Sequence, residues 1–150
     1  MNGTTVAAGA GEGRWIGGER IVLKVRGAQT GQALAFLEDT VQPGYAPPPH
    51  IHLEENEIFY VLEGTFTFSL GDKTIDAPPG TLVSVSKGTL HTFQNVGDAP
   101  GKLLAVVWTA VAFENFVAEA GTPEPLSGPP DIEFLLAAAE RNGIIVPPPG

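Results

Sequence analysis

Glycine and proline divide this chain into short apolar segments, and this division limits its possible folds more than any other feature. The 150 residues include 19 glycines and 14 prolines. Turn-forming pairs such as Pro43-Gly44, Glu63-Gly64 and Gly71-Asp72 separate the apolar runs. This spacing is typical of many short strands joined by turns. No helical segment lies between the runs to carry parallel crossovers, so the pattern predicts an all-β sandwich or barrel.

Residues 20–26 show the strand pattern most clearly. Ile21, Leu23 and Val25 fall on one face, and basic or β-branched residues fall on the other. That alternation indicates a strand with one solvent-exposed face. The other predicted strands are residues 32–41, 49–53, 57–63, 65–70, 73–77, 81–85, 90–95 and 101–110.

The residue composition of the chain changes after residue 110. Residues 112–120 and 131–142 are rich in Ala, Glu and Leu, which predicts two short helices. Asp131 is placed to cap the second helix, and Gly143 is placed to end it. The length favours one domain. We expect a flexible N-terminal segment (1–14), a barrel (15–110) and a helical C-terminal extension packed on the barrel (111–150).

Charge and composition exclude several classes of partner. The net charge is −9, and the eight lysines and arginines are scattered, so we expect neither nucleic acid nor an anionic membrane surface as a partner. No apolar run approaches the ~20 residues that span a bilayer. The first residues lack the features of a secretory signal, so we expect a cytoplasmic protein. The absence of cysteine means that any metal must be held by imidazole and carboxylate groups.

The chain contains three histidines, and their positions suggest a metal site. His50 and His52 are two residues apart, so on a strand both imidazoles lie on one face. Glu57 opens the next predicted strand, and His91 lies at the start of another. If these faces point inward, the three imidazoles and the carboxylate converge. We interpret Glu54 and Glu55 as solvated turn charges, although either is an alternative to Glu57.

Two motifs resemble the conserved motifs of the cupin superfamily. Residues Gly44 to Gly64 fit G-x5-H-x-H-x4-E-x6-G at every defined position. Residues Gly80 to Asn95 fit G-x5-P-x-G-x2-H-x3-N, except that Ser86 stands where proline is usual. The resemblance implies a small jelly-roll β-barrel whose metal ligands are His50, His52, Glu57 and His91. Asn95 is expected to be a polar residue at a turn or strand end.

The chain is also similar to single-domain cupins of the quercetin 2,3-dioxygenase type. Shared features include Trp15 before the first predicted strand, the Pro-Pro-His-x-His run and a tail beginning near Phe113-Glu114. This resemblance implies a metal-dependent dioxygenase that acts on a flavonol or another enol or aromatic small molecule and uses O2. Glu57 would serve as catalytic base as well as ligand.

The resemblance also suggests further properties of the site. The metal would be one divalent ion, namely Ni, Fe, Mn, Co, Cu or Zn, because this ligand set discriminates poorly among them. The expected pocket residues, for which core packing is the alternative, are Phe59, Val61, Phe66, Phe68, Phe93 and Trp108.

Other functions remain open within the same superfamily. The same ligands serve isomerases, decarboxylases and oxidases of small acids, and a non-enzymatic barrel that binds a small ligand or a metal is a further alternative. We also expect a homodimer, because small cupins commonly pair through edge strands and an exposed strand at 20–26 needs a cover.

Overall fold

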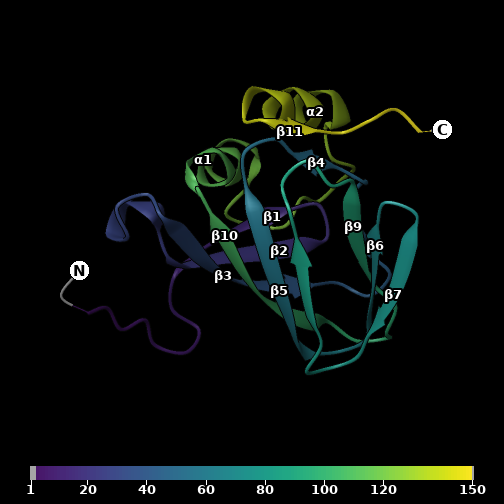
Figure 1. Ribbon diagram of the computed structural model, residues 1–150, viewed down its shortest axis with the longest axis horizontal. Coiled ribbons are helices and arrows are strands. Elements are labelled where there is room, and N and C mark those ends of the chain that lie inside the picture. Colours follow the sequence, from purple (N-terminus) through teal and green to yellow (C-terminus); the bar gives the residue numbers. More distant parts are fainter. Residues whose placement is uncertain (1–2, 150) are drawn as a thin grey trace.

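The structure is a computed structural model that describes residues 3–149 (Figure 1). Its helices are α1 (Val111–Ala120) and α2 (Ile132–Arg141), and a single 3-10 turn lies at Gly27–Gln29. The strands, in chain order, are β1 (Glu12–Ile16), β2 (Glu19–Val25), β3 (Leu34–Val41), β4 (Ile51–His52), β5 (Asn56–Glu63), β6 (Phe66–Leu70), β7 (Lys73–Ala77), β8 (Leu82–Val85), β9 (His91–Asn95), β10 (Gly101–Trp108) and β11 (Ile144–Ile145).

The strands form two main antiparallel sheets that enclose the core. The larger sheet has the order β1-β2-β3-β10-β5-β8, and the smaller has the order β7-β6-β9. The short strands β4 and β11 pair with each other, and a bridge between His50 and His91 joins the segment before β4 to β9. This architecture confirms the predicted small jelly-roll β-barrel with short C-terminal helices.

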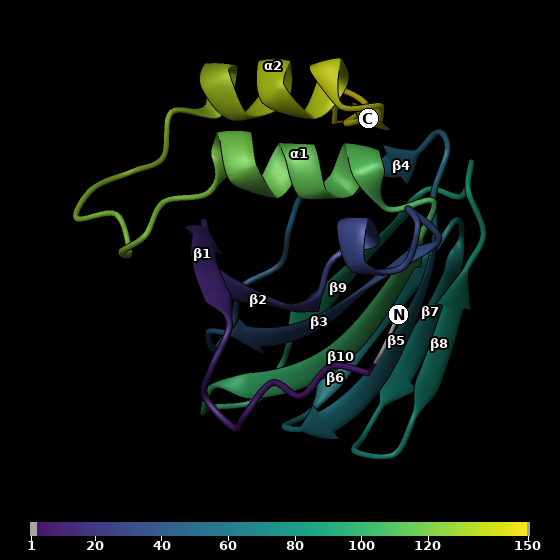
Figure 2. The same ribbon diagram turned by 90° about the vertical axis from the view of Figure 1, so that its left-hand side faces the viewer.

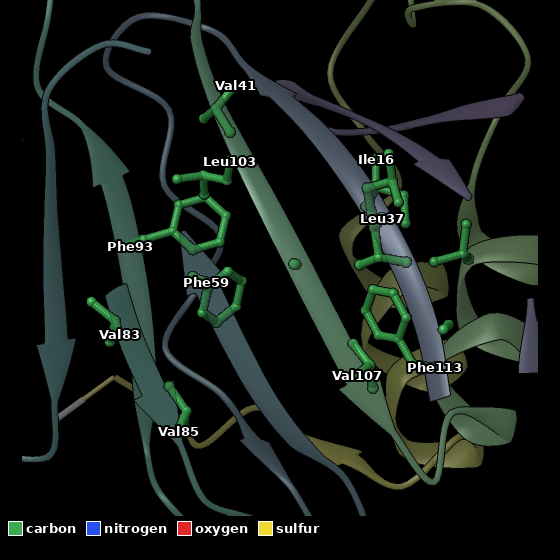
Figure 3. Close-up of a cluster of buried hydrophobic side chains, with 14 of the residues drawn as sticks. Ile16, Leu37, Val41, Phe59, Val83, Val85, Phe93, Leu103, Val107 and Phe113 are labelled. Atoms are coloured by element: carbon green, nitrogen blue, oxygen red, sulfur yellow. The ribbon is translucent and has the colours of Figure 1, made fainter. Parts of the chain in front are cut away.

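The core lies between the sheets because alternate residues of each strand point inward. In β3 and β10 every second residue is buried. Phe59 of β5 and Phe93 of β9 point toward one another from the two sheets, with ring centroids 5.7 Å apart (Figure 3). A side chain on Gly101 would meet the ring of Phe66 at 2.7 Å, so this glycine lets β10 pass close to the aromatic core.

The two helices lie one above the other across one end of the barrel (Figure 2). Asp131 caps α2 as predicted, since its side chain accepts a hydrogen bond from the backbone N–H of Phe134 at 3.0 Å. Beyond α2 the chain turns at Gly143, and Ile144 of β11 then pairs with His52 of β4. The C-terminal segment therefore reaches the edge of the histidine region.

The N-terminal region differs from the expectation. Residues 12–14, which the sequence suggests are flexible, form the start of β1, and β1 pairs with β2 along its length. Glu12-Gly13-Arg14 lacks apolar alternation, which is why this strand escapes detection in the sequence. The chain thus covers β2 with its own β1, and β2 is not an exposed edge. Residues 1–2 of the expected segment lie outside the described residues.

In the part of the chain that the structure describes, no helix is long and apolar enough to cross a membrane.

Candidate metal centre

The segment that carries His50 and His52 is held against β9. It follows three consecutive prolines, residues 47–49, which favour an extended backbone. The backbone N–H of His50 donates to the carbonyl of His91 at 3.0 Å, and the N–H of His91 donates back to the carbonyl of His50 at 2.9 Å. This exchange fixes the two histidine-bearing segments side by side.

The structure brings His50, His52, Glu57 and His91 into one cluster. One ligand atom from each residue lies within 4.8 Å of those of the other three. Oε2 of Glu57 is 2.9 Å from Nε2 of His91 and 3.5 Å from Nε2 of His52. His52, Glu57 and His91 are buried, and His50 is partly exposed. Convergent, mostly buried donors of this kind can bind one metal ion.

The Nδ1 atom of each histidine is already engaged. Nδ1 of His50 lies 2.9 Å from the carbonyl oxygen of Pro48, and Nδ1 of His91 lies 2.9 Å from that of Thr89. Nδ1 of His52 lies 3.0 Å from a carboxylate oxygen of Glu55. Because these oxygens only accept hydrogen bonds, Nδ1 carries the proton in each neutral ring. Nε2 is then left with a lone pair for a metal, and each ring is held in one orientation.

Glu55 corrects one expectation from the sequence. It is not a solvated turn charge, since it is only 2% exposed. One oxygen of its carboxylate meets His52, and the other accepts a hydrogen bond from the backbone N–H of Phe113 at 2.6 Å. That N–H lies in the first turn of α1, where helix amides lack partners within the helix. Glu54, by contrast, is exposed as expected.

The charges of the cluster add to the effect of burial at His50 and oppose it at His52 and Glu57. Burial lowers the pKa of His50 to about 4, and the neighbouring His91 and His52 act in the same direction. Burial also disfavours the charged forms of His52 and Glu57. Even so, the pKa of His52 is raised by the carboxylates of Glu57 and Glu55, and the histidines hold the pKa of Glu57 below its usual range. Glu57 is therefore ionised at neutral pH.

Three imidazoles and one carboxylate are a suitable donor set for a first-row divalent transition metal. The set leaves positions free on an ion that takes five or six ligands. The donor chemistry and the fixed Nε2 orientation thus fit the metal that the resemblance implies, and they do not select among Ni, Fe, Mn, Co, Cu and Zn.

A cavity of about 300 Å³ adjoins the cluster. His50, His52 and Glu57 form part of its wall, and residues of α1, α2 and the C-terminal segment close over it. Figures 1 and 2 show both helices at this end of the barrel. Its volume is at the lower end of the range for small-molecule sites.

Two of the six expected pocket residues line this cavity, namely Phe59 and Phe93. Val61, Phe66 and Phe68 are fully buried in the core and do not reach it. Trp108 follows the inward-facing Val107 in β10, so it lies on the other face of the sheet, where it is half-buried.

The lining also contains two acidic residues that were not singled out from the sequence, Glu19 and Asp39. The alternation of residues along the strands could have shown that both side chains point inward. Glu19 has the same parity as Ile21 in β2, and Asp39 has the same parity as Leu37 in β3. Burial raises the pKa of Asp39 to about 8, with the charge of Glu57 as the next cause.

Comparison with known protein families identifies a cupin domain over residues 37–107. Among curated proteins, the chain is 27% identical over 81 residues to an uncharacterized protein of Methanocaldococcus jannaschii. The match covers 54% of this chain and 65% of that protein, so the chain spans just under two thirds of the relative's length.

Solved structures share the fold at low sequence identity. A predicted oxalate decarboxylase from Thermotoga maritima has a TM-score of 0.65 and 22% identity, covering 70% of this chain and 98% of the other. A cupin-superfamily sugar phosphate isomerase from Silicibacter pomeroyi has a TM-score of 0.60 and 22% identity, covering 70% and 75%. The polyketide cyclase RemF from Streptomyces resistomycificus has a TM-score of 0.54 and 25% identity, covering 66% and 68%. Residues 37–107 thus match a cupin domain, and the chain shares its fold with these solved structures.

Proposed function

We propose that this protein is a metal-dependent dioxygenase of the quercetinase type, acting on an uncharged aromatic enol such as a flavonol. Its metal would be held by His50, His52, Glu57 and His91. The observation that carries the choice of substrate is the lining of the cavity beside these residues.

The cavity wall is mainly apolar. Among the residues that the structure describes, no lysine or arginine lines it, whereas Glu19, Asp39 and Glu57 do. A phosphate or a dicarboxylate would meet no lysine or arginine there, and it would face the ionised carboxylate of Glu57. Aromatic side chains such as Phe59, Phe93 and Phe113 offer faces for an aromatic ring instead. The lining therefore favours an uncharged aromatic molecule.

Glu57 is suited to accept the hydroxyl proton of such an enol. Its carboxylate is ionised, lines the cavity and belongs to the cluster, so an enol oxygen at the cluster would lie within its reach. A bound divalent ion would supply Lewis acidity for the enolate oxygen and a site for O2. Both atoms of O2 enter the products of such a ring-opening dioxygenation. The reaction therefore needs no external reductant.

Two alternatives remain as outcomes of the test. The solved structures similar to this one include a predicted oxalate decarboxylase and a sugar phosphate isomerase, so a metal-dependent isomerase, decarboxylase or oxidase of a small acid is one. A barrel that only binds a small ligand or a metal is the other. The lack of lysine and arginine in the described lining counts against a small anionic substrate.

Oxygen uptake tests the proposal directly. Protein loaded separately with Ni, Co, Mn and Fe is mixed with flavonols in an oxygen electrode, and at least one metal should give O2 consumption that matches flavonol loss. Absence of uptake with every metal and flavonol would contradict dioxygenation. Anaerobic turnover of a keto or hydroxy acid would instead favour the first alternative.

The Glu57→Ala variant tests the role of the carboxylate. Normal metal content with abolished activity would support a base, whereas loss of metal would leave ligation as its only demonstrated role. Glu63→Ala is the matched control, because Glu63 is an exposed glutamate on the same strand.

A further inference from the structure

Glu19 and Asp39 are neighbours on the inner face of the larger sheet. In the antiparallel pairing of β2 with β3, Ile21 is opposite Asp39. Glu19 lies two residues from Ile21 on the same face, so Glu19 and Asp39 are diagonal neighbours across the two strands. Both side chains line the cavity beside the metal cluster.

Each of the two carboxyl groups has a buried oxygen without a partner. Asp39 is only 4% exposed, and its Oδ1 makes no hydrogen bond within the described part of the chain. The same holds for Oε2 of Glu19. The other buried polar side chains, such as Glu55, His91 and Asn95, all have partners. Because an unpaired buried polar group costs stability, these two oxygens suggest a partner that arrives with a ligand.

The surroundings of the pair favour a hydroxyl partner over a charged one. Burial and the charge of Asp39 raise the pKa of Glu19 well above its usual value, as burial and Glu57 do for Asp39. Asp39 is thus largely protonated at neutral pH, and the shift at Glu19 favours its protonated form. A protonated carboxyl group offers an O–H donor and an acceptor oxygen. An ammonium ligand would require them to ionise among the apolar side chains of Ile16, Ile21 and Leu37.

We propose that Glu19 and Asp39 form a second subsite, which hydrogen-bonds ring hydroxyl groups of an uncharged aromatic ligand whose reacting end lies at the metal cluster. This inference rests on the proposed function for the position of the reacting end. The carboxyl pair orients the ligand along the cavity and discriminates hydroxylated from unsubstituted rings. Neither residue takes part in the chemical step.

The test uses small probes of the subsite and needs no turnover. Binding of resorcinol, toluene and benzylamine is measured by protein NMR on the full chain, both as purified and after chelation of metal. The variants are Asp39→Leu, Asp39→Asn and Glu19→Gln, and the control is Asp76→Asn, which alters an exposed acid on β7. Because the metal is absent from one arm, the result does not depend on its chemistry.

We expect Asp39→Leu to weaken the binding of resorcinol, relative to that of toluene, by about tenfold. This is the effect of losing one or two net hydrogen bonds. The preference for resorcinol over toluene should be mostly kept in Asp39→Asn and Glu19→Gln, because both variants retain a donor and an acceptor. It should be unchanged in Asp76→Asn. An unchanged ratio in Asp39→Leu, failure of resorcinol to bind, or tighter binding of benzylamine than of resorcinol would overturn the subsite. Lack of oxygen uptake with flavonols would contradict the proposed function and leave this binding ratio unaffected.

Discussion

The carboxylate of Glu55 accepts a hydrogen bond from Nδ1 of His52 at 3.0 Å. Through its other oxygen, Glu55 also binds the N–H of Phe113 in the first turn of α1. One buried side chain therefore connects the metal cluster to the helix that covers the cavity. The orientation of His52 and the position of α1 depend on the same residue.

Replacement of Glu55 by alanine should weaken metal binding. The imidazole of His52 would lose the partner that fixes its orientation, and loss of such a partner typically lowers metal affinity about 10- to 100-fold. Competition titration with a chelating dye measures this affinity. Glu54→Ala is the control, since Glu54 is the exposed neighbour. Equal affinities for the two variants would contradict the role that we assign to Glu55.

The stability of the protein should fall as pH rises through the titration range of Asp39. Its pKa is 3.8 in an ordinary environment and about 8 in the fold. Between these values the folded state holds a proton that the unfolded chain has released. The free energy of unfolding therefore decreases with rising pH, by at most about 1.4 kcal/mol per pH unit for one proton.

Urea denaturation across this pH window measures the slope, and Asp39→Asn should flatten it because the amide does not titrate. The pKa of Glu19 is also raised, so its titration should leave some pH dependence of stability in that variant. If Asp39→Asn had the same slope as the wild type, Asp39 would not hold a proton in the folded state.

Asn95 should matter for stability and not for metal binding. It lies at the end of β9, as the sequence suggests, and it is fully buried there. Its Nδ2 donates to the carbonyls of Val41 and Ala99, and its Oδ1 accepts from the N–H of Gly97, each at 2.9 Å. Asn95→Ala should lower the free energy of unfolding by about 2 to 4 kcal/mol.

Chemical denaturation of Asn95→Ala checks this value, with Gln94→Ala as the exposed neighbouring control. A similar small effect in both variants would show that the three hydrogen bonds of Asn95 contribute little.

The homodimer stays a prediction, and its structural basis has changed. The chain covers β2 with its own β1, so the larger sheet has β1 and β8 as its edge strands. Leu82 of β8 is 58% exposed, which gives this edge an apolar side chain to bury. Sedimentation at micromolar concentration should show a dimer, and Leu82→Lys should shift it toward monomer. A wild-type monomer would contradict the prediction.

The sequence predicts much of this architecture because turn residues and alternation are local signals. The predicted strands and both helices agree with the observed elements to within a few residues. The spacing of the motifs likewise singled out the four residues that the structure brings together. The strands and helices need only the order of residues and the turns between them, whereas the choice of Glu57 over Glu54 and Glu55 came from the resemblance to the cupin motifs.

The roles that depend on distant contacts could not be predicted in this way. Glu55 acts through Phe113, which is 58 positions away in the chain. Glu19 and Asp39 lie on the inward-facing side of their strands, but acidic residues are so rarely buried without a partner that alternation alone does not identify them as buried. Phe66 and Phe68 also point inward, and only the packing around them shows that the cavity does not reach them.

The measurement that most directly tests the central claim is the stoichiometry of metal binding. The chain has three histidines, and all three belong to the cluster, so a His50→Ala/His91→Ala double variant removes half of the proposed ligands. Titration followed by elemental analysis should find one tightly bound divalent ion per wild-type chain and almost none in the double variant. Wild-type protein that binds no divalent metal, or a double variant that binds it equally well, would contradict the account.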